Sequence, residues 1–452
     1  MPLKISSRSS CCHEKKNYID QSVDLAVLNY RLGRGQREQQ VVILTGSHLC
    51  HNPRVQKEAA TLARAGYRVK VLGGWVDPGL KQRDEALAGV LPFEFIPVQD
   101  LTGRGVSDIR HRATRKLGAA AYRGFGLGNS WQLGAAYPAL RRAASRHGTA
   151  DLYIAHSEQA LAVATELRAR GRRVAVDMED WFSEDLLPEA RRNRPVELLR
   201  RLEVELLTTG AFTSCPSRAM SRVLAEEFGC PPPTVIYNGF PWAERALLDG
   251  RIKDRAGCRD LSIHWFSQAI GPGRGLEDLL AALPLLIHPT VVHLRGTPVA
   301  GFDTWLAERV PRTWRDRVFV HGIVPNAELL SRIAEHDIGY AGEMRHCHSR
   351  DLTVTNKILQ YLLAGLAVVA SDTEGQREVA EQAGEAVLLF PSGNPQALAA
   401  RLDEFLGAPE RLARAKAAAL KAAQESFCWE RQEPMLLDAV ARALAQPVAV
   451  GW

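Results

Sequence analysis

The chain has 452 residues, of which 46% are hydrophobic and 24% are charged. This length suits two or three domains, and the composition excludes a collagen, a coiled coil and a wholly disordered chain. The 57 basic residues exceed the 51 acidic ones, and the net charge of +6 fits phosphate-bearing ligands or an anionic membrane surface but is too small to indicate nucleic acid.

The sequence predicts a cytoplasmic protein. It has no run of eighteen apolar residues, which argues against a transmembrane helix, and its N-terminus lacks the apolar core of a signal peptide. None of the eight cysteines belongs to a C-x-x-C pair or to a cluster with zinc spacing. Single thiols suit a reducing compartment, and we expect neither a metal site nor a cofactor.

The first half of the chain alternates apolar runs with helical segments after a loose extension at 1–40. Short apolar runs are typical of buried strands, and longer amphipathic segments are typical of helices. Strands are expected at 41–45, 67–72, 91–98, 151–156, 172–177 and 211–215, with a last apolar run at 234–237. Helices are expected at 53–65, 107–123, 130–147, 157–170, 195–209 and 217–228.

A second alternating series follows a polar connection at 241–260. Its strands are expected at 261–267, 290–296, 317–322, 337–342, 366–372 and 386–390, and its helices include one beginning at 275 and others at 394–407, 409–426 and 428–445. Two such series predict two Rossmann-like, doubly wound parallel-sheet domains, at 41–240 and 261–426. Ligands of these sheets bind at the carboxyl ends of the strands, so we expect an interdomain cleft that brings two substrates together.

The turn after the first strand of the second series has the composition of a phosphate site. Gly273 and Gly275 allow close backbone approach, and the following helix offers free N–H groups to an anion. Arg274 adds a planar cation that matches phosphate. The alternative is a tight turn with a solvated arginine.

A second helix start carries the same chemistry. Thr355, Asn356 and Lys357 supply a hydroxyl, an amide and a charge next to free helix N–H groups. The alternative is ordinary N-capping with an exposed lysine. Together with Arg274 at the same edge of the predicted sheet, the pattern favours binding of a diphosphate.

Polar side chains also follow three strands of the first domain. His156 ends a strand, where an imidazole can bind a sugar hydroxyl or stabilise developing charge, although a single histidine is often structural. Glu179 and Asp180 belong to an acidic loop that can orient an acceptor, with a solvated loop as the alternative. The first loop would line the acceptor side of the same cleft with Gly46, His51 and Asn52.

One segment of the first domain carries a strong basic bias. Residues 104–123 hold six arginines or lysines, with apolar residues among them at helical spacing. Such a helix can make peripheral contact with anionic lipid, and a solvated basic helix is the alternative.

Six segments in a fixed order resemble glycosyltransferase family 4, whose members have the GT-B fold and use nucleotide-sugar donors. The resemblance covers most of 41–445. The segments are HNPRVQKEAATLARAGYRVKVL, SRAMSRVLAEEFG with TVIYNGF, FSQAIGPGRGLEDLLAAL, VFVHGIVPNAELLSRIAEHDIGYA, NKILQYLLAGLAVVASDTEGQREV and FCWERQEPMLLDAVARAL. The resemblance implies that residues 427–452 form a helix that crosses back onto the first domain.

The resemblance also implies roles for particular residues. It places the donor phosphates near Arg274 and Lys357, the base near Gly322 and Ile323, and His156 beside the transferring sugar. It implies transfer of the sugar to an acceptor hydroxyl with retention at the anomeric carbon. Because Arg274 and Lys357 would stabilise the charge on the leaving diphosphate, we expect the reaction to proceed without a metal. The acceptor stays open and includes lipid-linked molecules at the inner face of the membrane.

One departure from the family pattern affects the donor site. Two glutamates eight positions apart are common in the family, and Leu352 and Gln360 stand at the corresponding positions here. Glu343 and Asp351 lie nearby at a different spacing. This departure leaves open an altered sugar preference or a non-catalytic nucleotide-sugar-binding relative. An epimerase or hydrolase on the same fold is a further alternative.

Overall fold

The structure is a computed structural model that describes residues 38–103, 129–134, 136–185, 191, 194–255 and 257–447. Most of the expected extension 1–40 and the whole basic segment 104–123 lie outside these residues. Within the described part, no helix combines the length and the apolar character needed to cross a bilayer.

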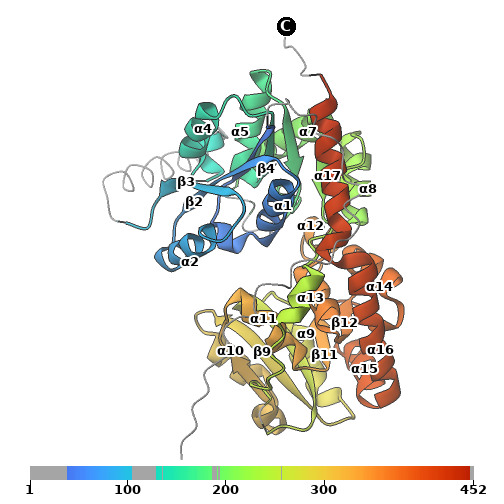
Figure 1. Ribbon diagram of the computed structural model, residues 1–452. Helices are drawn as coiled ribbons and strands as arrows, with labels where there is room; N and C mark the ends of the chain where they lie inside the picture. The colour runs from blue at the N-terminus through green and yellow to red at the C-terminus, as the bar shows by residue number, and fades with distance from the viewer. Residues whose placement is uncertain are drawn as a thin grey trace, which may run out of the picture. The chain divides into compact units, whose positions relative to one another are not determined.

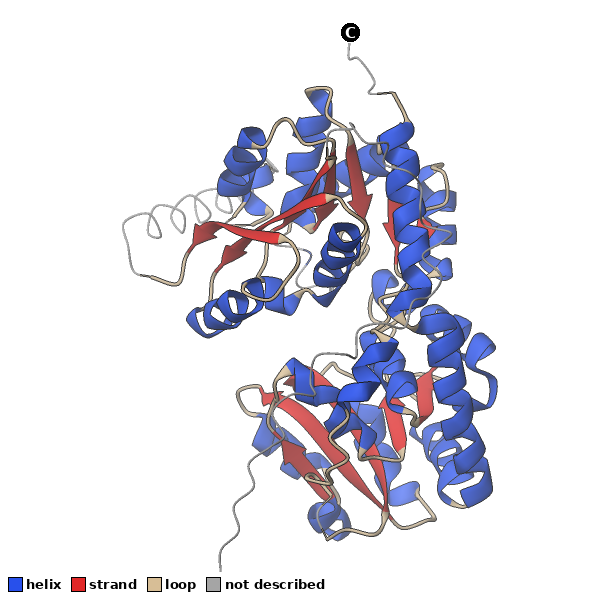
Figure 2. Ribbon diagram, in the orientation of Figure 1, coloured by secondary structure: helices blue, strands red, loops and turns tan. Residues whose placement is uncertain are grey.

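The first domain is built on a seven-stranded parallel sheet in the order β3-β2-β1-β4-β5-β6-β7. The central strands β1 and β4 are almost wholly buried, as expected for strands covered by helices on both faces (Figure 2). The strands are β1 (Gln40–Thr45), β2 (Arg68–Trp75), β3 (Glu94–Asp100), β4 (Leu152–His156), β5 (Val174–Asp177), β6 (Thr213–Cys215) and β7 (Thr234–Val235). The helices are α1 (Pro53–Arg64), α2 (Pro78–Ala88), α4 (Tyr137–Arg146), α5 (Glu158–Ala169), α7 (Val196–Thr209) and α8 (Arg218–Phe228).

The second domain contains a six-stranded parallel sheet in the order β10-β9-β8-β11-β12-β13. Its strands are β8 (Leu261–Ile270), β9 (Thr290–Pro298), β10 (Val318–His321), β11 (Ile338–Ala341), β12 (Ala367–Ser371) and β13 (Val387–Phe390). Its helices are α9 (Leu276–Ala282), α10 (Phe302–Arg309), α11 (Asn326–Ala334), α12 (His348–Leu352), α13 (Asn356–Ala364), α14 (Glu374–Ala383), α15 (Pro395–Leu406) and α16 (Pro409–Ala422). The prediction of two doubly wound parallel sheets is therefore confirmed.

The chain passes between the two domains twice, and the two crossings contact each other. The first crossing follows β7, and the second leads from α16 into α17 (Trp429–Ala445). The Trp429 backbone N–H donates to the Phe240 carbonyl at 3.0 Å, and a Cβ on Gly239 would lie 1.9 Å from the Phe427 carbonyl oxygen. Beyond the crossing, α17 packs against α1 of the first domain (Figure 1).

One helix was missed, and two predicted helices have different bounds in the structure. Helix α2 was not predicted, because its only buried residue is Asp84 and it lacks an apolar stripe. The helix expected at 130–147 starts only at Tyr137, since residues 130–132 form a separate 3₁₀ turn capped by Asn129. The helix expected at 409–426 changes at Ala423 into a π-helical turn.

Candidate functional site

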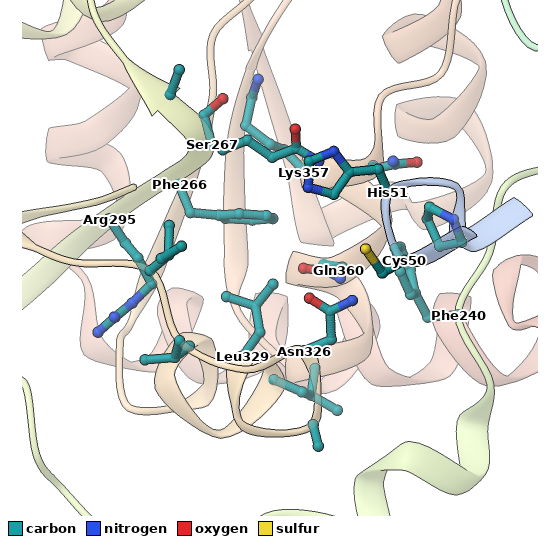
Figure 3. Close-up of a pocket in the computed structure, with 18 of the residues that line it drawn as sticks. Cys50, His51, Phe240, Phe266, Ser267, Arg295, Asn326, Leu329, Lys357 and Gln360 are labelled. Atoms are coloured by element: carbon teal, nitrogen blue, oxygen red, sulfur yellow. The ribbon is translucent and has the colours of Figure 1, made fainter. Parts of the chain in front are cut away.

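A cavity of about 960 Å³ is lined by residues of both domains. The second domain contributes the ends of β8 and β9 and the starts of α11 and α13, and the first domain contributes the short η1 turn (Leu49–His51), α1 and α2. Figure 3 shows side chains from both domains around this space. The predicted residues that line it are His51, Arg274, Ile323, Thr355, Asn356, Lys357 and Gln360.

The two predicted phosphate-binding cations line this one cavity. Arg274 lies in the β8–α9 turn, where Gly273 and Gly275 have φ values of 75° and 79°. Both values fall in the left-handed region that favours glycine. A Cβ on Gly275 would also lie 2.6 Å from the Gly342 carbonyl oxygen, so this turn packs directly against the segment after β11.

The cations differ in their surroundings. Lys357 forms an ion pair with Glu343, and their side chains are only 14% and 6% exposed. Arg274 is exposed and makes no hydrogen bond or ion pair with any residue that the structure describes. Arg274 is therefore free to bind an anion, whereas Lys357 shares its charge with a carboxylate.

The segment that the resemblance assigns to the base follows β10. Ile323 lines the cavity and is 59% exposed. Gly322 does not line it, and its carbonyl accepts a hydrogen bond from Arg295 Nη1 at 2.5 Å. Arg295 also pairs with Asp254 of the interdomain connection, so the turn is held by a cation–carboxylate pair.

The first loop of the first domain presents His51 and Cys50 to the cavity (Figure 3). Gly46 and Asn52 do not line the cavity. A Cβ on Gly46 would overlap the Gln159 side chain, and the Asn52 Oδ1 atom accepts from the Val55 N–H at 3.0 Å, capping α1.

His156 is fully buried and does not line the cavity. Its Nδ1 lies 2.7 Å from Glu179 Oε1, and its Nε2 lies 3.0 Å from Glu58 Oε2. Burial opposes charge on the ring, but the two carboxylates outweigh it and raise the pKa of His156 well above its usual value. The ring is therefore a buried cation behind Glu179, which is itself partly exposed.

A second ion pair supports this histidine. The Arg54 guanidinium donates to both carboxylate oxygens of Asp177 and to the Ile236 carbonyl. Burial raises the pKa of Glu58 to about 7, although the neighbouring His156 lowers it. The result is a buried polar network at the carboxyl ends of β4 and β5.

The acidic loop after β5 contacts the second domain. The Arg350 Nε atom, from α12, lies 3.3 Å from Asp185 Oδ1, and the Trp181 N–H donates to Ser349 Oγ at 3.0 Å. Burial and the carboxylates of Asp185 and Glu179 raise the pKa of Asp180 to about 8. Neither Glu179 nor Asp180 lines the cavity, whereas Arg350 does.

Two groups of buried side chains have ligand atoms close enough to hold a metal ion: His48, Cys50 and Asp84, and Glu58, His156 and Asp177. In the first group, Asp84 contacts His48 Nδ1 at 2.8 Å, and His48 Nε2 accepts from two backbone N–H groups. In the second group, Arg54 contacts both carboxylates. We assign the first group as a hydrogen-bonded network and the second as a network of ion pairs, because a cation would have to displace these partners.

Two family models match the chain in sequence. A glycosyl transferase 4-like domain matches residues 51–239, and the glycosyl transferases group 1 domain matches residues 263–408. Together they cover more than half of the chain and both sides of the cavity. The chain belongs to the glycosyltransferases of the GT-B fold.

Solved structures share the fold of this glycosyltransferase. The Anabaena HepE protein, solved in complex with UDP and glucose, is 18% identical with a TM-score of 0.65, covering 89% of this chain and 100% of HepE. Sucrose-phosphate synthase from Thermosynechococcus elongatus is 15% identical with a TM-score of 0.65, covering 90% and 100%. A UDP-forming trehalose-phosphate synthase from Burkholderia xenovorans is 12% identical with a TM-score of 0.62, covering 92% and 100%. No curated protein matches the sequence significantly.

Sequence reasoning did not assign several charged residues of the glycosyltransferase that lie at or behind the cavity, among them Glu343, Lys57 and Glu58. Glu343 and Lys57 line it, and Glu58 supports His156. The spacing of Arg54 and Glu58, four residues apart, places both on one face of α1 and was a usable signal. Lys57 gave no comparable signal, because its partners lie about 180 residues away in sequence.

Proposed function

We propose that this glycosyltransferase transfers a sugar from a uridine diphosphate sugar to an acceptor hydroxyl, with retention at the anomeric carbon and without a metal. The observation that carries the proposal is that Arg274 and Lys357, which lie near the N-termini of two different helices, line one cavity. The choice of uridine rests on HepE, whose structures contain UDP or UDP-glucose, and on the UDP-forming synthase.

The proposed chemistry is electrostatic. As the bond to the leaving diphosphate breaks, negative charge grows on its oxygens, and fixed cations aimed at that charge lower the barrier. Arg274 supplies an unshared charge, and Lys357 adds a second at the N-terminus of α13. In this proposal the two side chains take the place that a metal ion occupies in other transferases. A leaving-group oxygen takes the proton of the incoming hydroxyl, which places the acceptor on the face that the donor leaves.

We place the acceptor on the first-domain side of the cavity, against His51. Neither Glu179 nor His156 lines the cavity, so His156 would act only through Glu179, which its Nδ1 atom contacts. A lipid-linked acceptor at the inner face of the membrane would bring the basic segment 104–123 to anionic headgroups. Flotation of the protein with vesicles containing anionic lipid, compared with neutral vesicles, tests that contact.

The function is tested with purified protein and a panel of uridine and guanosine diphosphate sugars. Binding is measured by calorimetry, and products are measured by mass spectrometry with and without an acceptor panel. Arg274→Ala and Lys357→Ala are expected to reduce turnover severely, whereas Arg442→Ala, an exposed arginine of α17, is the control. Release of free sugar would indicate a hydrolase, an altered sugar that stays on the nucleotide would indicate an epimerase, and binding without turnover would indicate a non-catalytic relative. Unchanged turnover in both cavity variants would refute the proposal.

A further inference from the structure

Lys57 lies on α1, lines the cavity and is the one cation there with three separate oxygen acceptors among the residues that the structure describes. Its Nζ donates to the Asn238 carbonyl at 3.2 Å, to Asn238 Oδ1 at 2.7 Å and to the Gly239 carbonyl. An ammonium group has three N–H donors. All three are therefore engaged within the protein, and none is left for a ligand.

These acceptors belong to the first crossing between the domains. The ammonium also contacts Trp429, which belongs to the second crossing. Nζ lies 4.5 Å from the centre of the Phe240 ring and 5.1 Å from that of Trp429. Both distances are within the range of a cation–π contact. Because Gly239 is packed directly on Phe427, a side chain that holds the first crossing also fixes its contact with the second.

The first crossing is linked in turn to the donor side of the cavity. Asn238 Nδ2 donates to Asn356 Oδ1 at 2.8 Å, and Asn356 is the first residue of α13, directly before Lys357. The contacts thus run from α1 through Lys57 and Asn238 to the helix entrance that carries Lys357.

We propose that Lys57 is a positioning residue that fixes the crossing of the two interdomain connections and, through Asn238, the N-terminus of α13. The consequence for ligand binding rests on the proposed function, because it requires the diphosphate to bind at that N-terminus. The effect of Lys57 on hydrogen exchange in the unliganded protein does not depend on the proposed function.

Several charged groups face the ammonium. Two of them, Arg54 and Glu58, lie on the same helix as Lys57. Glu179 follows β5, and Glu244 lies in the connection between the domains. Glu430 of α17 lies close to Glu244. Burial, with Arg54, lowers the pKa of Lys57 to about 7, although the carboxylates raise it. Above that pH the neutral amine has only two N–H donors for three acceptors, so the positioning effect weakens.

The experiment compares Lys57→Met, Asn238→Ala and Lys81→Met with the wild type. Lys81, also in the first domain, pairs with Asp100 and contacts Trp75, and its change removes the same charge away from the cavity. Hydrogen exchange of the unliganded protein is expected to rise at 236–243, 427–432 and 355–358 in Lys57→Met. In Asn238→Ala, which keeps both backbone acceptors, it is expected to rise mainly at 355–358.

UDP is the probe for the ligand readout, measured by calorimetry. Its affinity is expected to fall about three- to tenfold in Lys57→Met and Asn238→Ala, and not in Lys81→Met. The ratio of wild-type to Lys57→Met affinity is expected to fall from pH 6 to pH 8.5, because Lys57 loses its proton in this range. Ionisation of UDP affects both proteins equally and therefore cancels in the ratio. Exchange that changes only within α1, or unchanged exchange at 355–358 in Asn238→Ala, would overturn the inference even if Lys57→Met fails to fold. If the wild type binds no UDP, the proposed function fails, and the exchange data alone decide the role of Lys57.

Discussion

The pairing of Lys357 with Glu343 allows binding and stability to be separated by mutation. In Lys357→Met the Glu343 carboxylate, 6% exposed, loses its cation. Removing one partner of a buried ion pair costs about 3–5 kcal/mol, and the 14% exposure of Lys357 places the expected loss near 3 kcal/mol. For a domain of this size, that corresponds to a fall of roughly 6–12 °C in the unfolding temperature.

The affinity for UDP is expected to fall in the same variant for a different reason. Lys357 would supply one charge-assisted hydrogen bond to the diphosphate, worth about 1.5–3 kcal/mol. Its loss corresponds to an affinity about 10- to 100-fold lower. Arg274→Ala is expected to show a similar loss of affinity with an unchanged unfolding temperature, because Arg274 has no partner among the described residues.

The double variant Lys357→Met/Glu343→Gln distinguishes the two effects. It removes the unpaired carboxylate charge, so it is expected to regain most of the stability but none of the UDP affinity. Calorimetric unfolding and isothermal titration on the single and double variants give both quantities, with uridine as the control ligand that lacks phosphates. Recovery of wild-type UDP affinity in the double variant would show that Lys357 does not bind the diphosphate. A double variant as unstable as Lys357→Met would show that the ion pair is not the cause.

Two further predictions concern the mouth of the cavity and the pH dependence of stability. Arg83→Ala is expected to weaken UDP binding about two- to fivefold, because Arg83 brings a positive charge to the cavity from α2. Lys81→Ala on the same helix is expected to leave the UDP affinity unchanged, because Lys81 pairs with Asp100 and does not line the cavity. Equal affinities of the two variants, measured by calorimetry, would contradict this prediction. Burial raises the pKa of Glu203 from 4.5 to about 7. Its protonated form therefore contributes stability that is fully present below pH 4.5 and is lost as the pH rises to about 7. In Glu203→Gln the urea midpoint is expected to depend less on pH between these two values. If the midpoint of the variant changes with pH as in the wild type, Glu203 is not the cause of the pH dependence.

The alternation of strands and helices was predictable because parallel strands covered on both faces are short, largely apolar runs. β1, β4 and β12 are of this kind, and each was predicted within about two residues. α2 escaped prediction for the opposite reason, since it packs through a buried carboxylate rather than an apolar stripe. Asp84 accepts hydrogen bonds from the Cys50 N–H at 2.7 Å and lies 2.8 Å from His48. No local pattern reveals such a contact before the fold is known.

The site shows the same division between local and long-range information. Arg274 and Lys357 were predictable because each stands at the start of a helix at the carboxyl edge of one sheet, and topology alone brings such positions together. The environment of His156 was not predictable, because Glu58 and Glu179 come from different elements about 100 and 23 residues away. The position of His156 at the end of a strand was read from the sequence, whereas the charge of its ring follows only from the packing of the two carboxylates against it.

The contacts between the domains are distributed unevenly, and this decides which side of the cavity is held least firmly. The Glu378 carboxylate of α14 accepts from the N–H groups of Arg218 and Ala219 at 3.0 and 2.9 Å, capping α8 across the interface. On the side of α2 and α11, the described residues form one hydrogen bond, from Arg83 to Asn326 at 3.4 Å. Opening at α2 therefore breaks one weak contact, whereas opening at α8 leaves two helix N–H groups without their carboxylate. The end of the cavity beside α11 is consequently the end at which opening breaks the fewest of these hydrogen bonds between the domains.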